Sequence, residues 1–365
     1  MEEMSVTTLV ASLGFLLGCV LGGTARYAHF CTLGAIADVY VSGDTRRLRS
    51  WGLAIAVATL LTQAMDLAGL IDLRAAIYLT PDFGWLGAIL GGLLFGFGTA
   101  LVGTCGYGTL VRLGGGDLRS LVVFLVFGIT AYMTLRGLTG VGRVAAIEPT
   151  NLDLGPLGGQ ALQDLLGWVT GIEADALHGF AAAAVVAFLF LACFSSPVFR
   201  RAPRYIIGGA VIGLVVAAGW FVTGVIGYDD FEPTPLESLT FATPLGEALV
   251  YLMTFSGSTI NFGIGVVGGV LVGSWLASLA RREFRFEAFD DAKEMLRHLL
   301  GGALMGVGGV LALGCTIGQG ITGMSTLSLS APLALLSIFA GAGLGLRYLE
   351  EGSLSQAVKL FFQRG

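Results

Sequence analysis

Long apolar stretches, separated by short polar turns, run through most of the chain. A membrane-spanning helix needs about 20 consecutive apolar residues, and windows of that length predict nine crossings. These cover residues 5–25, 51–71, 84–113, 119–138, 177–198, 205–226, 259–280, 298–325 and 330–348. The third and the eighth are too long and too rich in glycine to be simple helices, so we expect broken helices there.

Two further apolar stretches, residues 27–41 and 240–253, are too short to cross a membrane. We interpret them as re-entrant helices, which enter and leave the bilayer on the same side. The alternative interpretation is a helix on a loop, buried at the membrane interface. Residues 280–298 are instead highly charged, and we expect them to form a helical cytoplasmic link between two crossings.

The composition agrees with this pattern, because 55% of the residues are hydrophobic, 12% are charged and the mean hydropathy is +0.82. A chain of 365 residues with so little charge cannot cover itself with a water-facing surface. No basic patch suited to nucleic acid is present, and the beginning, MEEMSVTTLV, lacks the positive residues of a cleaved secretory signal. The sequence therefore predicts an all-α polytopic membrane protein.

The positions of Lys and Arg predict its orientation, because cytoplasmic loops are enriched in both. If the N-terminus lies outside, all 20 positive residues except Arg74, Arg136 and Arg143 fall on the cytoplasmic side. The acidic loop at 227–237 then faces outward. We therefore expect an outer N-terminus and a cytoplasmic C-terminus.

A repeat relates the two halves of the chain. Leu90–Gly108 (LGGLLFGFGTALVGTCGYG) and Leu300–Gly318 (LGGALMGVGGVLALGCTIG) align without a gap, which pairs Gly98 with Gly308 and Cys105 with Cys315. Corresponding crossings lie five apart, an odd number, so the halves are expected to insert in opposite directions, as in many transporters. Close backbone approach is expected at the paired glycines. The predicted segments are a first inverted repeat (1–140), an outer loop with a linking crossing (141–204), a second inverted repeat (205–349) and a cytoplasmic tail (350–365).

Four half-helices are expected to begin near Cys31, Cys105, Cys315 and the pair Ala242 and Thr243. Unpaired N–H groups at such ends carry a partial positive charge, which favours an anion near the membrane midplane. The distinctive side chains are thiols, which are weak donors with a polarisable sulfur. This combination favours a soft, sulfur-containing anion.

At these residues the chain resembles the YeeE/YedE sulfur-transport family. The resemblance covers most of the chain and depends on RYAHFCTLGAIADVY, GTALVGTCGYGTLVRLGGGDLRSL and GCTIGQGITGMSTLS. It implies an hourglass of spanning helices and short inward-pointing helices in the bacterial inner membrane. It also implies thiosulfate uptake along a narrow path of cysteines, which pass the anion inward through S–H contacts.

Carried over residue by residue, the resemblance assigns the path to Cys31, Cys105 and Cys315. Cys19 and Cys193 are interpreted as packing residues, a role that any buried thiol can also fill. The residues assigned supporting roles lie beside the cysteines or at the start of the second re-entrant helix: Arg26, His29, Thr32, Gly106, Tyr107, Gly108, Thr243, Thr316, Gly318 and Gln319. For Arg26 and His29, the alternative is an anchoring role at the basic membrane interface.

Two other functions remain open at this stage. One is a sensor of thiosulfate on the same fold, and the other is an intramembrane sulfurtransferase. A sulfurtransferase needs an acid or base beside its thiol, but no Asp, Glu, Lys or His lies within four residues of Cys105 or Cys315. His29, near Cys31, is the exception. We therefore expect a transporter and not an enzyme.

We expect no cofactor, no metal and no disulfide framework. The three histidines, His29, His178 and His298, do not stand at metal-ligand spacing with the cysteines. The expected partners are thiosulfate or a similar small anion, membrane lipid and a cytoplasmic sulfur-carrier or regulatory protein. A hydrosulfide-like or selenium species stays open as the ion, and Asp38 and Asp66 are the candidates for a proton relay.

Overall fold

Helices form almost the whole of the computed structural model, which describes residues 5–228, 234–353, 355–357 and 359. The first half contains α1 (Val6–Ala28), α2 (Thr32–Ser42), α3 (Arg46–Leu67), η1 (Leu73–Ala75), η2 (Ile77–Leu79), α4 (Trp85–Val102), α5 (Gly106–Gly114) and α6 (Leu118–Arg136). The middle contains α7 (Leu138–Ala146), η3 (Glu148–Thr150), η4 (Gly155–Leu157), α8 (Leu162–Thr170), α9 (Ala174–Phe194) and α10 (Pro197–Arg200). The second half contains α11 (Pro203–Phe221), η5 (Val222–Ile226), α12 (Ala242–Thr254), η6 (Phe255–Gly257), α13 (Phe262–Ala280), α14 (Ala292–Leu311), η7 (Gly318–Gly323) and α15 (Ser330–Glu351). The only strands within the described ranges are β1 (Asp82–Phe83) and β2 (Leu152–Asp153), which pair antiparallel.

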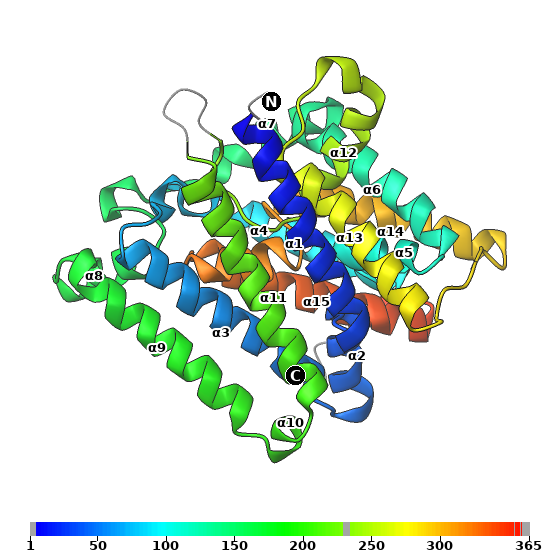
Figure 1. Ribbon diagram of the computed structural model, residues 1–365, viewed down its shortest axis with the longest axis horizontal. Coiled ribbons are helices and arrows are strands. Elements are labelled where there is room, and N and C mark those ends of the chain that lie inside the picture. Colours follow the sequence, from blue (N-terminus) through cyan, green and yellow to red (C-terminus); the bar gives the residue numbers. More distant parts are fainter. Residues whose placement is uncertain (1–4, 229–233, 354, 358, 360–365) are drawn as a thin grey trace.

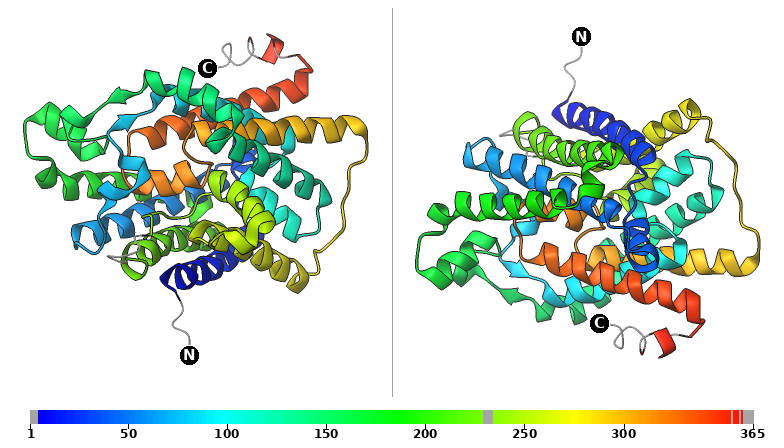
Figure 2. Two further views of the ribbon diagram at one scale, coloured as in Figure 1. Left: turned by 90° about the horizontal axis from the view of Figure 1, so that it is seen from above. Right: turned by 90° about the horizontal axis from the view of Figure 1, so that it is seen from below.

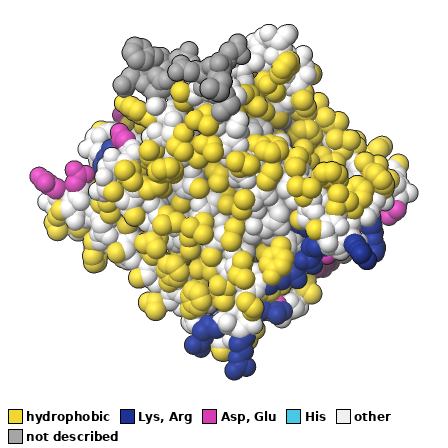
Figure 3. Space-filling model, viewed as in Figure 1, with side chains coloured by type: hydrophobic (Ala, Val, Ile, Leu, Met, Phe, Trp, Pro, Cys, Tyr) yellow, Lys and Arg dark blue, Asp and Glu magenta, His cyan; other side chains and the backbone are white. Residues whose placement is uncertain are grey.

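Eight helical segments within the described residues are long and apolar enough to cross a membrane. They coincide with eight of the nine predicted crossings, and hydrophobic side chains cover the broad face that they present (Figure 3). The remaining prediction, at 298–325, corresponds to α14 and η7, and α14 carries Lys293, Glu294 and Arg297 in its first two turns. The protein is thus an all-α polytopic membrane protein, and the count of nine crossings stays a prediction.

Both short apolar stretches form separate helices, as the sequence predicts. The stretch at 27–41 is divided, because α1 continues to Ala28 and His29 then adopts a left-handed conformation (φ 50°) that ends it. The stretch at 240–253 gives α12, in which Pro244 is the third residue. Each short helix therefore begins at the predicted place, within one or two residues.

The two glycine-rich crossings are broken, also as predicted. Gly103 ends α4 with φ 80°, a conformation that favours glycine, and α5 begins after Cys105. In the second half, α14 ends at Leu311 and a π-helical segment, η7, begins after Cys315. A break of the helix therefore precedes each of the two paired cysteines.

Helices of the two halves pack against each other in exchanged pairs. The pairs are α1 with α13 and α3 with α11, then α4 with α15 and α14 with α6, while α4 and α14 contact each other between them. Figure 1 shows α1 and α13 side by side, and Figure 2 shows α1 and α15 on opposite flanks of the bundle. Such an exchange is what the predicted repeat requires, although the direction in which each half inserts stays a prediction.

The paired glycines lie in the contact between α4 and α14, as expected. A Cβ atom added to Gly98 would lie 2.6 Å from the Gly301 carbonyl oxygen, and one added to Gly308 would lie 2.5 Å from the Phe95 nitrogen. Neither distance is compatible with a side chain. Only glycine lets these two helices approach so closely.

The predicted outer loop after residue 141 contains more structure than a loop. Its helix α8 is fixed to the bundle, because the Asp164 carboxylate lies 3.0 Å from Arg74 Nη2 and the Leu162 amide donates to the Leu327 carbonyl. These polar contacts come from distant parts of the chain. Apolar windows in the sequence therefore do not reveal them.

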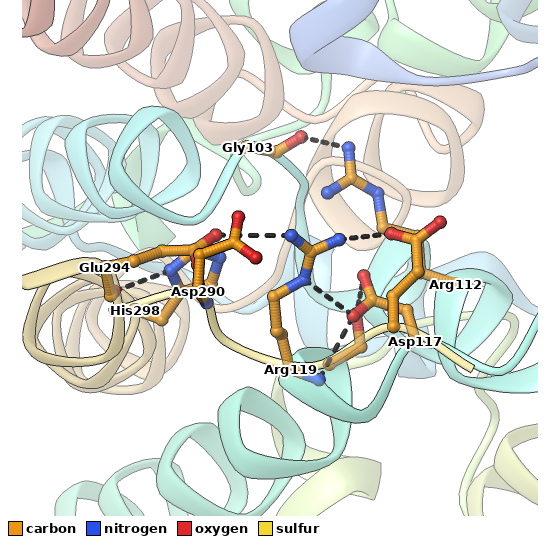
Figure 4. Close-up of polar contacts among 9 residues, drawn as sticks. Gly103, Arg112, Asp117, Arg119, Asp290, Glu294 and His298 are labelled. Carbon is orange, nitrogen blue, oxygen red and sulfur yellow. Dashed lines mark hydrogen bonds and ion pairs between the residues drawn. The ribbon is translucent and has the colours of Figure 1, made fainter. Parts of the chain in front are cut away.

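The prediction of a helical link at 280–298 is wrong for its first half. Residues after α13 are extended, because the amides of Arg285 and Glu287 donate to the carbonyls of Gly115 and Gly116, so the link pairs with the turn between α5 and α6. Arg119 holds the same contact together through ion pairs with Asp117 (3.0 Å), Glu294 (3.2 Å) and Glu287 (Figure 4). Helix α14 begins only where Asp291 caps it.

Candidate functional site

The three cysteines of the predicted path converge at the breaks between helices. Cys31 caps α2, Cys105 precedes α5, and Cys315 stands just before η7. Cys105 and Cys315 are fully buried, whereas Cys31 is half-buried. Cys105 lies close enough to both of the other thiols to interact with them electrostatically, and Tyr107 lies near all three. The structure therefore brings together residues that are far apart in the sequence.

Two of the thiols accept hydrogen bonds from free backbone amides. The Gly34 amide donates to Cys31 Sγ at 3.5 Å, and the Gly318 amide donates to Cys315 Sγ at 3.4 Å. Each of these amides belongs to the first turn of a helical segment, where N–H groups have no partner within the helix. Each cysteine consequently lies in the partial positive charge that such a helix start provides.

A vestibule of about 570 Å³ leads to Cys31 from one end of the molecule. We call it the basic vestibule, because Arg26, Arg47 and Arg112 line it together with His29 and Glu283. Gly103, Thr104 and Gly108, which surround Cys105 in the sequence, also line it. Both cysteines are thus adjacent to a positively charged opening.

The charges of the basic vestibule are held in place by further contacts. Arg26 Nε lies 3.3 Å from the Glu283 carboxylate, and Arg112 Nη2 donates to the Gly103 carbonyl at 2.7 Å. A hydrogen bond from Arg281, together with the charge of Arg26, keeps the pKa of Glu283 below its usual range. Glu283 is therefore ionised at neutral pH and partly offsets the positive charge.

A second vestibule, of about 410 Å³, lies at the other end of α1. Helix α1 runs between the two, because Thr7 and Val10 in its first turns line this vestibule and Ala25 and Arg26 line the basic one. We call it the acidic vestibule, since Glu237 and Glu247 are the charged residues of its lining. Its other polar side chains are those of Asn261 and of the threonines Thr7, Thr223, Thr234, Thr240, Thr243 and Thr259.

The acidic vestibule reaches the third cysteine through Thr240. A Cβ atom added to Gly318 would lie 2.4 Å from Thr240 Oγ1, so no side chain separates Thr240 from the turn that follows Cys315. The backbone of Phe241 also contacts the Cys315 thiol. The order across the molecule is therefore the acidic vestibule, Cys315, Cys105, Cys31 and the basic vestibule.

The hydroxyls next to the cysteines differ in their availability. Thr32 Oγ1 is buried with no hydrogen-bond partner among the described residues, and the buried Thr316 hydroxyl has the weakly hydrogen-bonding Cys105 thiol beside it. The Tyr107 hydroxyl is not free, because it donates to the Phe30 carbonyl. Gln319 donates to the Ala312 carbonyl at 2.6 Å, and its own side-chain carbonyl oxygen has no hydrogen-bond partner in the described part of the chain. The two threonines are thus the side chains best able to contact a passing ion.

The other predicted supporting residues also lie at these positions. Gly106 begins α5, where its Cα faces the Phe127 ring, and Thr243 lines the acidic vestibule. Arg26 and His29 line the basic vestibule, so they are available to an anion even if they also anchor α1. Asn261 caps α13, because its side chain accepts from the Ile264 amide at 2.9 Å.

The remaining candidates lie away from both vestibules. Cys193 is buried against α3 and donates to the Arg49 carbonyl, and Cys19 contacts the backbone of α13.

Asp38 is paired with Arg47 at 3.2 Å. Asp66 accepts from the Leu73 amide and lies 3.6 Å from His178. Neither aspartate lines a vestibule, and no group of metal-ligating side chains occurs in the described ranges.

Several lining residues could not be recognised from the sequence. Arg47, Arg112 and Glu283 are ordinary charged residues of cytoplasmic segments, and only the fold brings them to one cavity. Glu237 and Glu247 belong to no motif and were likewise missed. The one available signal was the acidic residue within the apolar stretch 240–253, at position 247.

Comparisons with known proteins identify relatives over nearly the whole chain. The thiosulfate transporter TsuA of Escherichia coli (strain K12) is 28% identical over 338 residues, which cover 90% of this chain and 91% of that protein. The thiosulfate transporter TsuA of Spirochaeta thermophila is 26% identical over 344 residues, covering 90% and 96%. A family model described as sulphur transport matches residues 27–344, the range that holds all three path cysteines. With its cysteines gathered at helix breaks between two vestibules, the chain belongs to the sulphur transport family.

Proposed function

We propose that this protein takes up thiosulfate across the inner membrane, along a path from the acidic vestibule past Cys315, Cys105 and Cys31 into the basic vestibule. The observation that carries the proposal is the position of Cys105, fully buried and within electrostatic reach of both other thiols. The names of the two relatives support thiosulfate as the anion. A soft anion can then move between neighbouring sulfur atoms without leaving the path.

The chemistry of the path suits passage rather than tight binding. A thiol is a weak donor, and a helix start supplies only partial charge. Among the described residues that line the two vestibules, arginines, which would hold an anion strongly, occur in the basic vestibule at the end of the path. We infer that the anion is released there and that no covalent step takes place.

The orientation proposed is an outer N-terminus and a cytoplasmic basic vestibule. The excess of Lys and Arg at that end supports it. The exchanged helix pairs support two inverted repeats, residues 1–140 and 205–349, joined by 141–204. Release into the basic vestibule would present the anion to a cytoplasmic sulfur-carrier or regulatory protein.

The test is uptake of labelled thiosulfate into proteoliposomes, with labelled sulfate as the competing substrate. We expect Cys31→Ala, Cys105→Ala and Cys315→Ala each to lower uptake, because each removes one contact of the path. Cys19→Ala and Cys193→Ala are matched controls and should transport normally, since both thiols lie outside the path. Normal uptake by a folded triple alanine variant would overturn the cysteine path, and thiosulfate binding without flux would favour a sensor.

A further inference from the structure

The acidic vestibule poses an electrostatic problem for an anion transporter. Its charged lining residues, Glu237 and Glu247, are both acidic, and its lining as described contains no Lys, Arg or His. Two carboxylates in a cavity of about 410 Å³ would repel an anion at the start of its path. Something must therefore reduce the negative charge there.

Glu247 is fixed with its carboxylate towards the vestibule. Asn261 Nδ2 donates to Glu247 Oε2 at 2.8 Å. The carbonyl oxygen of the same amide accepts from the Ile264 amide, so Asn261 is held by the cap of α13 and cannot turn to present that oxygen to Glu247. Glu247 is thus oriented as a hydrogen-bond acceptor.

Glu237 has a fixed backbone and a carboxylate without a partner. Its carbonyl accepts from Thr223 Oγ1 at 2.6 Å, and its amide donates to the same hydroxyl at 3.3 Å. Within the described residues its carboxylate has neither a hydrogen bond nor an ion pair. Of the residues that the structure describes, the titratable groups near it are Glu247 from α12 and the buried Tyr78 from η2.

Among the described residues, the other elements around the vestibule contribute only neutral groups. Helix α1 contributes Thr7, η5 contributes Thr223, and α13 contributes Asn261. Burial, and then the charge of Glu247, raise the pKa of Glu237, which lies in the segment between η5 and α12, to about 8. A proton on Glu237 would remove one of the two charges.

We propose that Glu237 and Glu247 form a proton-binding pair that must hold a proton before an anion can enter the path from the acidic vestibule. The proton comes from the water on that side of the membrane and binds the unpartnered Glu237 carboxylate, while Glu247 keeps its bond with Asn261. This inference depends on the proposed function for the identity of the anion, but the proton site itself does not.

The pair is well placed to act on the path. Thr240, three residues after Glu237, contacts Gly318 in the turn that follows Cys315. Glu237 therefore lies in the segment that leads from the acidic vestibule to the first cysteine of the proposed path.

Infrared difference spectroscopy of the purified full-length protein tests the proton site without any transport. Titration about two pH units either side of pH 8 should show the carbonyl band of a protonated carboxyl disappearing as the pH rises through about 8. Glu237→Gln should lack this band. Glu247→Gln should keep it with a midpoint at lower pH, because removal of a neighbouring negative charge lowers the pKa of Glu237. Glu173→Gln, an exposed carboxylate at the start of α9, is the control and should match the parent.

Thiosulfate uptake by proteoliposomes tests the consequence. When the pH on the acidic-vestibule side rises above the midpoint, parental uptake should decrease by a factor that approaches ten for each pH unit. Glu237→Gln should retain uptake without this decrease. A band that persists in Glu237→Gln, or a parental pH profile in that variant, would overturn the inference. A correct titration in a protein that takes up no thiosulfate would instead overturn the proposed function and leave the proton site standing.

Discussion

Thr316 is a residue at which the proposed transport role and stability are expected to conflict. Its hydroxyl is fully buried, and its hydrogen-bond partner among the described residues is the Cys105 thiol, a weak one. A buried hydroxyl without a strong partner costs up to about 1–3 kcal/mol. The folded protein gains little from this arrangement, which is what a group reserved for a passing anion would show.

We therefore predict opposite effects of Thr316→Val on stability and on uptake. Valine has nearly the same shape but no hydroxyl, so the midpoint of thermal unfolding in detergent should stay the same or rise, while thiosulfate uptake should fall severalfold. Thr316→Ser, which keeps the hydroxyl, should restore most of the uptake. If valine lowered the unfolding midpoint and left uptake unchanged, the hydroxyl would have a structural role instead.

At the scale of single residues, the sequence predicts the path better than its two ends. Cys105 and Cys315 could be found because a repeat pairs them and glycines break the helices beside them. The vestibule residues lack any such signal. Arg26, Arg112 and Glu283 meet only because three distant segments fold to one opening.

At the scale of elements, the contact between α4 and α14 depends on glycine. Overpacking a tight contact typically costs about 1–3 kcal/mol, more than the roughly 0.5–1 kcal/mol that alanine gains over glycine within a helix. Gly98→Ala and Gly308→Ala should therefore lower the unfolding midpoint and the folded yield. The measurements are thermal unfolding and gel filtration of the purified protein.

Gly23→Ala provides the matched control for this prediction. Gly23 lies on α1, and its added Cβ would meet only the Gly273 carbonyl oxygen at 3.7 Å, an ordinary contact. This variant should be as stable as the parent or slightly more so. Equal stability of all three alanine variants would contradict the close approach of α4 and α14.

The extended link after α13 shows why a charged segment misleads a sequence-based prediction. Its charges suggest a helix, but its amides pair with the turn between α5 and α6, and Arg119 adds ion pairs with carboxylates of both segments. We predict that Arg119→Gln will loosen the link. Each partly exposed pair contributes up to about 1 kcal/mol, so trypsin should cleave after Arg285 several times faster.

Arg136→Gln, at the other end of α6, is the control and should leave cleavage unchanged. Because salt screens these pairs, cleavage of the parent should also accelerate as the salt concentration rises. Cleavage of Arg119→Gln at the parental rate would show that the backbone pairing alone holds the link.

At the scale of the whole molecule, apolar windows located the crossings because each spanning helix must be apolar over its length. They missed the structure of residues 138–170, since α7 and α8 need no such window. They also left the direction of each crossing to the Lys and Arg distribution. Orientation is therefore the feature of the fold that most needs a direct measurement.

Single cysteines at Glu173 and Phe286 provide that measurement, in a background in which all five native cysteines are replaced by alanine. Both positions are exposed, the first at the start of α9 and the second in the link after α13. The helices α9, α11 and α13 lie between them, an odd number of expected crossings, whereas the short α12 is expected to be re-entrant and to return to the side from which it starts. An impermeant maleimide added to intact cells should label position 173, and should label position 286 only after permeabilisation. Labelling of both from the same side would mean that one of the three helices does not cross or that α12 does, and the inverted repeat would then fail with the orientation.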